Sequence, residues 1–225
     1  MRSTTARTAV AALSVLAVLL TPTTATAHTA FSPGDRIALP VRDALAALPV
    51  QTESRAGYER TKFRHWTDAD RDGCSTRNEV LLEEAVTAPE QDASCRLTGG
   101  SWYSPYDDTY FTVARALDVD HLVPLAEAWD SGASTWTAKE RERYANDLDD
   151  PRALIAVSAT SNRSKADQDP ATWMPPAGGY WCTYATDWIT IKTRWNLTID
   201  QSEQTALADI LDGCPNTPVE VTLAR

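Results

Sequence analysis

The sequence has no surplus of basic residues. Its 21 lysines and arginines are outnumbered by 31 aspartates and glutamates, which gives a formal charge of −10 at neutral pH. Proteins that bind nucleic acid tightly and without sequence preference usually have a basic surface, so the composition argues against that class. A group of basic residues would offset the acidic charge if they gathered near one site, and they are equally consistent with a solvated face. These are Arg152, Arg163, Lys165, Lys192 and Arg194.

Hydrophobic runs long enough to span a bilayer are also absent. The longest, residues 9–20, is too short for a membrane helix and has the length of the apolar core of a secretory signal. Arginines precede it, and Ala25-Thr26-Ala27 follows it as a small-residue cleavage site. We therefore expect a signal peptide at residues 1–27 and a secreted mature chain without membrane attachment, whose formal charge is −12 (−10 − 2) once Arg2 and Arg7 are lost. A retained N-terminal anchor is the alternative.

The chain has four cysteines but no Cys-x-x-Cys spacing, so a thiolate zinc site is not indicated. In an exported chain, Cys74, Cys95, Cys182 and Cys214 predict two disulfides, for which three pairings are possible. We favour Cys74–Cys95 and Cys182–Cys214, because each pair closes a local loop within one segment. Loops of about 20 and 30 residues would each contribute on the order of 3 kcal/mol to stability.

Histidine is scarce, with only three in the sequence. His28 would begin the mature chain, and His65 lies in residues 55–66, where the spacing of the large side chains predicts a helix. His121 is therefore the best candidate for acid–base chemistry by elimination.

His121 lies in residues 117–125, a β-prone apolar run that we interpret as a strand ended by Pro124. Alternation along a strand places Asp118 and Asp120 on one face and His121 on the other. A carboxylate beside a histidine at a strand end suits metal-assisted hydrolysis, in which the carboxylate holds a divalent cation and the imidazole takes a proton from water. A surface strand with an incidental histidine is the alternative.

A second short apolar run follows at residues 153–157, and residues 158–167 predict a helical turn that carries an amide, a guanidinium and an ammonium. The segment Asp118-Val-Asp-His-Leu-Val-Pro, the second strand and Asn162-Arg-Ser-Lys together resemble the ββα-metal (His-Me finger) core of HNH endonucleases, including the HNH domain of CRISPR effector nucleases. The wider context is similar to the secreted HNH proteins of the DUF1524 type, which are related to the C-terminal domain of GmrSD restriction enzymes.

The wider resemblance extends over roughly residues 63–214 and rests on an ordered set of segments. These are residues 121–133, 144–147, 162–165 and 169–176 and the region of Cys182. The resemblance implies an α+β protein with a ββα-metal HNH core embedded in a mainly helical single domain with two disulfides. We expect an N-terminal arm or helix at residues 28–62, the nuclease domain at residues 63–215 and a loose tail at residues 216–225.

The resemblance also implies catalytic roles. His121 would deprotonate the water that attacks a phosphodiester, and Asp120 and Asn162 would hold one Mg²⁺ or Mn²⁺ through oxygen. Asp118 would support these residues without touching the metal. Asn162 has two other interpretations, as a helix cap and as the acceptor of an Asn-Arg-Ser glycosylation sequon, whose glycan would block the site.

Two supporting roles leave alternatives open. Lys165 or Arg163 would hold a phosphate of the substrate. Asn146 is our first choice for the residue that orients the His121 ring, and Asp147 is the second.

An acidic segment after His65 has the spacing of an EF-hand calcium loop, with carboxylates at positions 1, 3, 5 and 12 and glycine at position 6. The residues in those positions are Asp68, Asp70, Asp72, Glu79 and Gly73. The loop departs from the pattern because Ser75 replaces an apolar residue and no second loop is present. The alternative to a Ca²⁺ site is a set of Asp-rich turns that cap a helix.

From these observations we predict a secreted, monomeric HNH endonuclease that hydrolyses phosphodiester bonds in DNA, with RNA as the second choice of substrate. Two alternatives remain. One is a catalytically silent, calcium-stabilised secreted binding protein on the same scaffold. The other is a hydrolase of small phosphodiesters, which an acidic surface would suit better than polymeric DNA.

Overall fold

Two antiparallel strands and the helix that follows them position the candidate site. β7 (Leu117–His121) pairs with β8 (Leu154–Ser158) along its whole length. α5 (Ala159–Lys165) follows β8 directly and packs against both strands. The Ser158 hydroxyl caps this helix by accepting a hydrogen bond from the Ser161 N–H, which satisfies one of the free donors of the first turn. The order of these elements in the chain is therefore strand, strand, helix.

The structure is a computed structural model that describes Met1 and residues 32–225. The predicted signal peptide, residues 1–27, and His28 lie outside the described residues. None of the helices in the described part of the chain has the length and apolar character needed to cross a membrane.

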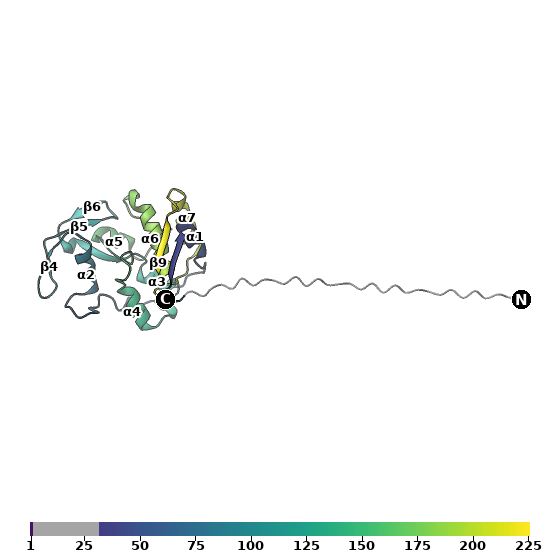
Figure 1. Ribbon diagram of the computed structural model, residues 1–225, viewed down its shortest axis with the longest axis horizontal. Helices are drawn as coiled ribbons and strands as arrows, with labels where there is room; N and C mark the ends of the chain where they lie inside the picture. The colour runs from purple at the N-terminus through teal and green to yellow at the C-terminus, as the bar shows by residue number, and fades with distance from the viewer. Residues whose placement is uncertain (2–31) are drawn as a thin grey trace. The chain divides into compact units, whose positions relative to one another are not determined.

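Most of the remaining elements are labelled in Figure 1. The helices are α1 (Val41–Ala47), α2 (Thr76–Glu83), α3 (Leu125–Asp130), α4 (Ala138–Ala145), α6 (Trp181–Arg194) and α7 (Gln201–Asp212). The strands are β1 (Arg36–Pro40), β2 (Ala85–Thr87), β3 (Glu90–Gln91), β4 (Leu97–Thr98), β5 (Ser101–Ser104), β6 (Thr109–Phe111) and β9 (Pro218–Thr222). Besides β7–β8, the pairings are β1–β9, β2–β5–β6 and β3–β4, all antiparallel.

A single hydrophobic core joins these elements, so the described residues form one mixed α+β domain. Large aromatic side chains dominate it, and Trp102, Tyr106, Tyr184, Trp188 and Trp195 are all buried. Aromatic side chains remove more apolar surface from water than any others, so they account for much of the stability. Tyr106 also has a polar role, because its hydroxyl reaches the candidate site.

Both predicted disulfides are confirmed. Cys74 is bonded to Cys95, and Cys182 is bonded to Cys214. The first bond closes the segment that contains the acidic loop. The second ties the start of α6 to the residues just after α7, so the two longest helices are joined covalently.

Two local predictions were wrong, and a third was right only in part. The tail at residues 216–225, predicted to be loose, contains β9, which pairs with β1 across the whole strand (Figure 1). The predicted arm or helix at residues 28–62 does contain a helix, α1, but β1 and α1 belong to the same domain as the rest of the described chain. Residues 55–66 are not a helix, since only the short 3₁₀ turn Arg60–Lys62 forms there. In each case a contact with a distant part of the chain decided the outcome.

Candidate functional site

A pocket of about 430 Å³ lies at the end of β7. It is lined by residues from β7, from the start of α3, from α5 and from the segment before residue 63. These are Tyr58, Arg60, Val119, Asp120, His121, Pro124, Leu125, Ala126, Asn162, Arg163, Ala166 and Asp167. The structure thus gathers His121, Asp120, Asn162 and Arg163 in one place. Asp120 and His121 share the pocket although they alternate along the strand, because His121 is the last residue of β7.

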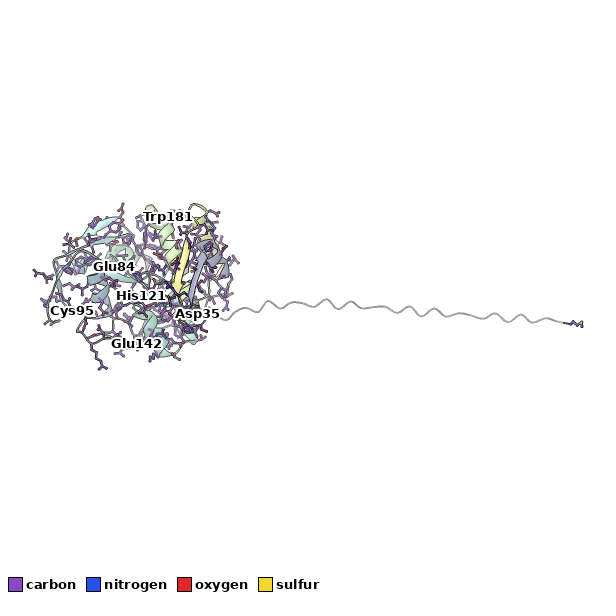
Figure 2. All side chains as sticks on the ribbon, in the orientation of Figure 1. Asp35, Glu84, Cys95, His121, Glu142 and Trp181 are labelled. Carbon is purple, nitrogen blue, oxygen red and sulfur yellow. A yellow bond between two sulfur atoms is a disulfide. The ribbon has the colours of Figure 1, made fainter. Side chains whose placement is uncertain are left out.

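His121 is 6% exposed, and Figure 2 shows it well inside the outline of the protein. Its Nε2 lies 3.0 Å from the backbone oxygen of Ala145. A carbonyl oxygen only accepts hydrogen bonds, so Nε2 carries the proton and Nδ1 keeps the lone pair. Burial lowers the pKa of His121 to about 3, opposed by the Ala145 hydrogen bond and assisted by the positive charge of Arg60. The ring is therefore neutral at physiological pH and has one basic nitrogen.

An aromatic side chain covers the His121 ring. The centroid of the Trp66 ring lies 5.0 Å from that of His121, with an angle of 31° between the planes. His65 stands at 6.3 Å, edge-on. Trp66 has a φ of +58°, a left-handed conformation that a bulky residue rarely adopts. Sequence reasoning missed Trp66, and no local pattern indicated that it would meet His121.

Asp120 uses one of its two carboxylate oxygens for hydrogen bonds. Its Oδ2 accepts hydrogen bonds from the Tyr106 hydroxyl at 2.6 Å and from the Lys165 ammonium at 2.5 Å. Both contacts use the same oxygen, so Oδ1 is the atom that remains to bind a cation. Burial raises the pKa of Asp120, and the Lys165 charge and hydrogen bond oppose that shift.

Lys165 does not line the pocket, and the expected phosphate contact does not fit its position. The side chain is 0% exposed. Its ammonium donates to Asp120 and also to the backbone oxygens of His121 at 3.1 Å and Leu122 at 2.8 Å. Lys165 therefore neutralises Asp120 and fastens α5 to the end of β7. Of the two residues expected to hold phosphate, only Arg163 can reach a ligand in the pocket.

Asp118 lies beside Asn162 and Arg163. The Asn162 side-chain nitrogen donates to Asp118 Oδ2 at 3.3 Å, and the Arg163 Nε lies 3.4 Å from the same oxygen. With its nitrogen committed to Asp118, Asn162 keeps Oδ1 for the pocket. The Arg163 side chain is 74% exposed, so its pairing with Asp118 leaves it accessible to a ligand.

Neither residue proposed to orient His121 touches it. Asn146 accepts from the Thr67 N–H at 2.9 Å and donates to the backbone oxygens of Arg64 and Glu142. Asp147 is buried and accepts hydrogen bonds from the side chains of Arg194 and Trp195. The orienting group is instead the carbonyl of Ala145, one position before Asn146. A backbone contact has no side-chain signature, so no residue type in the sequence pointed to Ala145.

The oxygens in the pocket fit a hard divalent cation. Asp120 Oδ1 and Asn162 Oδ1 are a carboxylate and an amide oxygen, the donor types that Mg²⁺ and Mn²⁺ prefer. Mg²⁺ usually keeps several of its waters and takes only one or two protein ligands, so two oxygens suffice. Soft sulfur donors are absent from the residues that line the pocket.

The basic residues that the sequence analysis grouped do not gather at the pocket. Arg152 pairs with Asp150 at 2.7 Å, and Arg194 pairs with Asp147 at 2.7 Å. Lys192 is completely buried between glutamates. Among that group, Arg163 is the one that lines the pocket.

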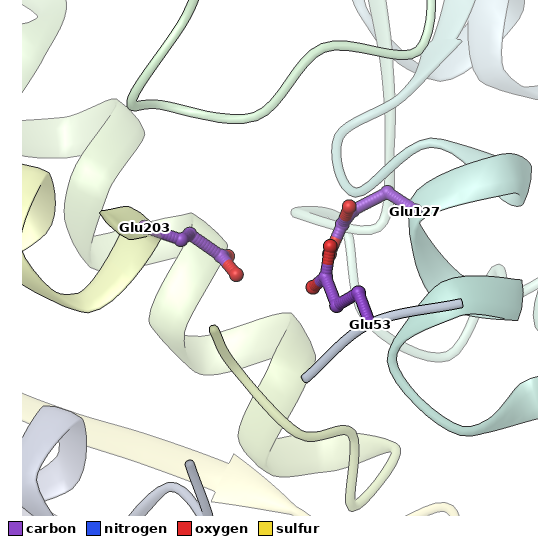
Figure 3. A group of neighbouring side chains, drawn as sticks. All are labelled: Glu53, Glu127 and Glu203. Carbon is purple, nitrogen blue, oxygen red and sulfur yellow. The ribbon is translucent and has the colours of Figure 1, made fainter. Parts of the chain in front are cut away.

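Lys192 is the centre of a buried cluster with Glu53, Glu127 and Glu203 (Figure 3). Its ammonium lies 2.7 Å from Glu127 Oε1 and 2.6 Å from Glu203 Oε2. In Figure 3 the carboxyl groups of Glu53 and Glu127 point toward each other. Burial and the neighbouring Glu127 raise the pKa of Glu53 to about 9, and burial raises that of Glu203 to about 7. A proton on Glu53 therefore joins the lysine in neutralising the cluster.

The segment that follows Glu53 forms one wall of the pocket. The Arg55 Nε lies 2.5 Å from Asp130 Oδ2, and its guanidinium also pairs with Asp167. The Trp129 indole donates to the backbone oxygen of Ala56 at 3.1 Å. These contacts hold the chain against α3 just before Tyr58 and Arg60 enter the pocket lining.

The acidic loop is separate from this pocket. The carboxylates of Asp68, Asp70 and Asp72 can approach one another within 4.8 Å, and all three residues are exposed. Glu79 has a buried Oε2 for which the described residues supply no hydrogen-bond partner. The pKa of Glu79 is raised by burial and by the negative charges of the three aspartates, so the four carboxyl groups interact electrostatically. Gly73 has a φ of +95°, which explains why glycine occupies the sharp turn.

The fold and the site together define a disulfide-bonded α+β protein with a histidine, a carboxylate and an amide in one pocket. The chain belongs to the family described as "GmrSD restriction endonucleases, C-terminal domain", which matches residues 60–210. It is also 42% identical over 178 residues to a protein of Arthroderma benhamiae named "Uncharacterized secreted protein", a match that covers 79% of this chain and 86% of the relative. No solved structure matches the chain.

These comparisons confirm part of what the sequence indicated. The protein is secreted, and it belongs to a nuclease-related family. The export prediction agrees with the two disulfides, because such bonds form and persist outside the cytosol.

Proposed function

We propose that this protein is a secreted, metal-dependent HNH endonuclease that hydrolyses phosphodiester bonds in nucleic acid. The observation that carries the proposal is the state of His121. Its Nε2 proton is committed to the Ala145 carbonyl, so Nδ1 is a free base in a ring that lines the same pocket as Asp120 and Asn162. The strand, strand, helix order of β7, β8 and α5 supports a ββα-metal core built around these residues.

In this proposal the Nδ1 of His121 accepts a proton from the water that attacks the phosphorus. Asp120 and Asn162 would hold one Mg²⁺ or Mn²⁺, which when bound stabilises negative charge on the phosphate and on the leaving oxygen. A phosphate beside His121 adds negative charge near the ring and raises its pKa, which makes it a better base when substrate is present. Arg163 holds a phosphate oxygen, and Ala145 and Trp66 keep the ring in place.

DNA is the substrate we favour, with RNA second. A hydrolase of small phosphodiesters and a catalytically silent binding protein remain the alternatives. The acidic net charge of the chain does not decide between nucleic acid and a small phosphodiester as the substrate. The pocket itself has basic residues, Arg60 and Arg163, in its lining beside Asp120 and Asp167.

We also propose that the acidic loop binds Ca²⁺. The support is the EF-hand spacing of Asp68, Asp70, Asp72 and Glu79 together with the buried, unpartnered oxygen of Glu79. This loop would stabilise the protein rather than take part in hydrolysis. Its disulfide, Cys74–Cys95, would hold the loop in shape whether or not the cation is bound.

A substrate panel tests the proposed function. Purified mature protein would be incubated with supercoiled plasmid, a structured RNA and a small chromogenic phosphodiester, each with Mg²⁺, Mn²⁺, Ca²⁺ or EDTA. Nicking of plasmid or cleavage of RNA that requires Mg²⁺ or Mn²⁺ is the expected result. Hydrolysis confined to the small substrate would favour the small-phosphodiester hydrolase. No hydrolysis with any metal would favour the binding protein.

A further inference from the structure

Four basic residues lie close together in the sequence just before Trp66. Residues 55–65 contain Arg55, Arg60, Lys62 and Arg64 but only one acidic residue, Glu59. The structure places this segment along the pocket, since Tyr58 and Arg60 line it and the His65 ring lies 6.3 Å from the His121 ring. Positive charge is therefore present where a phosphodiester would have to lie.

The basic residues around Arg60 already have partners. Arg55 pairs with Asp130 and Asp167. The Lys62 ammonium donates to the Gly57 backbone oxygen at 2.6 Å, lies 3.5 Å from Glu59 and sits over the Trp129 ring. Arg64 lies 3.3 Å from Glu142. These contacts fix the path of the segment.

Arg60 differs from its neighbours. It is exposed, and within the described part of the chain no carboxylate lies close enough to form a salt bridge with it. Arg60 lines the same pocket as His121, Asp120 and Asn162. A guanidinium without a carboxylate partner keeps its charge and its N–H donors for an anion that enters the pocket. This arrangement suits a site that receives a phosphate.

We propose that Arg60 contacts a backbone phosphate of the nucleic-acid substrate, from a different wall of the pocket than Arg163. The assignment rests on the proposed nuclease function and adds a substrate-binding residue to it. Arg60 belongs to the segment held by Arg55 and Trp129, and Arg163 belongs to α5. Two guanidiniums from separate elements would hold the phosphate backbone on both sides of His121, while the acidic remainder of the surface would confine binding to this pocket.

The test measures how binding depends on salt. Fluorescence anisotropy of a fluorescein-labelled DNA duplex, titrated in EDTA between 50 and 200 mM salt, would compare the wild type with Arg60→Gln, Arg60→Lys and Arg36→Gln. Arg36 is exposed on β1 and does not line the pocket, so Arg36→Gln makes the same change of charge at a site away from the pocket. Melting temperatures and plasmid cleavage with Mg²⁺ would be measured for the same four proteins.

We expect Arg60→Gln to weaken binding by about tenfold, as for loss of one charge-assisted hydrogen bond, and to reduce the salt slope by about 0.9. Arg60→Lys should keep the salt slope, because it keeps the charge. Arg36→Gln should match the wild type. If the wild type binds and cleaves DNA but Arg60→Gln behaves like Arg36→Gln, the assignment of Arg60 is overturned alone. If the wild type neither binds nor cleaves DNA, and the substrate panel shows no cleavage of RNA, the proposed function is overturned and the assignment with it.

Discussion

Replacing Lys165 with methionine should destabilise the protein strongly. The ammonium of Lys165 is fully buried, and it donates to Asp120 and to the backbone oxygens of His121 and Leu122. Methionine fills a similar volume but leaves the Asp120 charge buried without its counter-ion. Removing one partner of a buried ion pair costs about 3–5 kcal/mol. For a domain of this size each kcal/mol lowers the melting temperature by about 2–4 °C, so the expected fall is about 6–20 °C.

The assay is thermal unfolding followed by circular dichroism, with Arg163→Gln as the matched control. Arg163 lies two positions earlier on the same helix, but its side chain is exposed, so its loss should change stability by less than about 0.5 kcal/mol. Adding Asp120→Asn to Lys165→Met removes the unpaired charge and should recover part of the loss. A Lys165→Met protein that melts within about 2 °C of the wild type would refute the reasoning, and weaker DNA binding in that stable variant would restore the phosphate role expected from the sequence.

Three further predictions follow from the structure. The free energy of unfolding should fall as the pH rises from about 4.5 to about 9, because the pKa values of Glu53 (about 9) and Glu203 (about 7) are raised in the folded state, which then binds more protons than the unfolded state in this range. Urea titrations should show that Glu53→Gln reduces this fall, and an unchanged pH dependence would contradict the assignment. Trp66→Ala should lower kcat by about tenfold with little change in KM, because the His121 ring loses the aromatic side chain that packs against it. Trp66→Phe should retain most of the activity. Equal losses in both variants would rule out a positioning role through ring contact. Calorimetry should detect Ca²⁺ binding that Asp70→Asn weakens, and a melting temperature indifferent to both Ca²⁺ and EDTA would eliminate the calcium site.

The sequence predicted the parts of this fold that depend on short-range patterns. The two disulfides were found because each closes a local loop, and β7, β8 and α5 were found because their apolar runs and polar residues follow one another in a recognisable order. His121, Asp120 and Asn162 were expected to meet, and the structure places all three on one pocket.

What the sequence did not predict depends on contacts between distant residues. The role of Lys165 is decided by its burial against Asp120, and a lysine on a short polar helix gives no sign of that. The ring of His121 is oriented by the backbone of Ala145, which any residue at that position would supply. The pairing of β1 with β9 joins the two ends of the domain, so nothing in the composition of the tail distinguished a strand from a loose end.

Residues 55–66 show how helical spacing misled the prediction. Tyr58 and Trp66 lie at positions compatible with one helix face, but Gly57 has a φ of +74° and Trp66 has a φ of +58°, which no α-helix contains. The segment is fixed instead by contacts with α3, and that extended path is what brings Arg60 to the pocket.

The most direct test of the account is plasmid nicking by the wild type and by His121→Ala, with Mg²⁺ or EDTA and with melting temperatures measured beside it. The wild type should nick supercoiled plasmid only with the metal, and His121→Ala should lose the activity by at least about a hundredfold while it stays folded. Full activity in a folded His121→Ala protein would contradict the account, because the central claim is that the Nδ1 of His121 is the base.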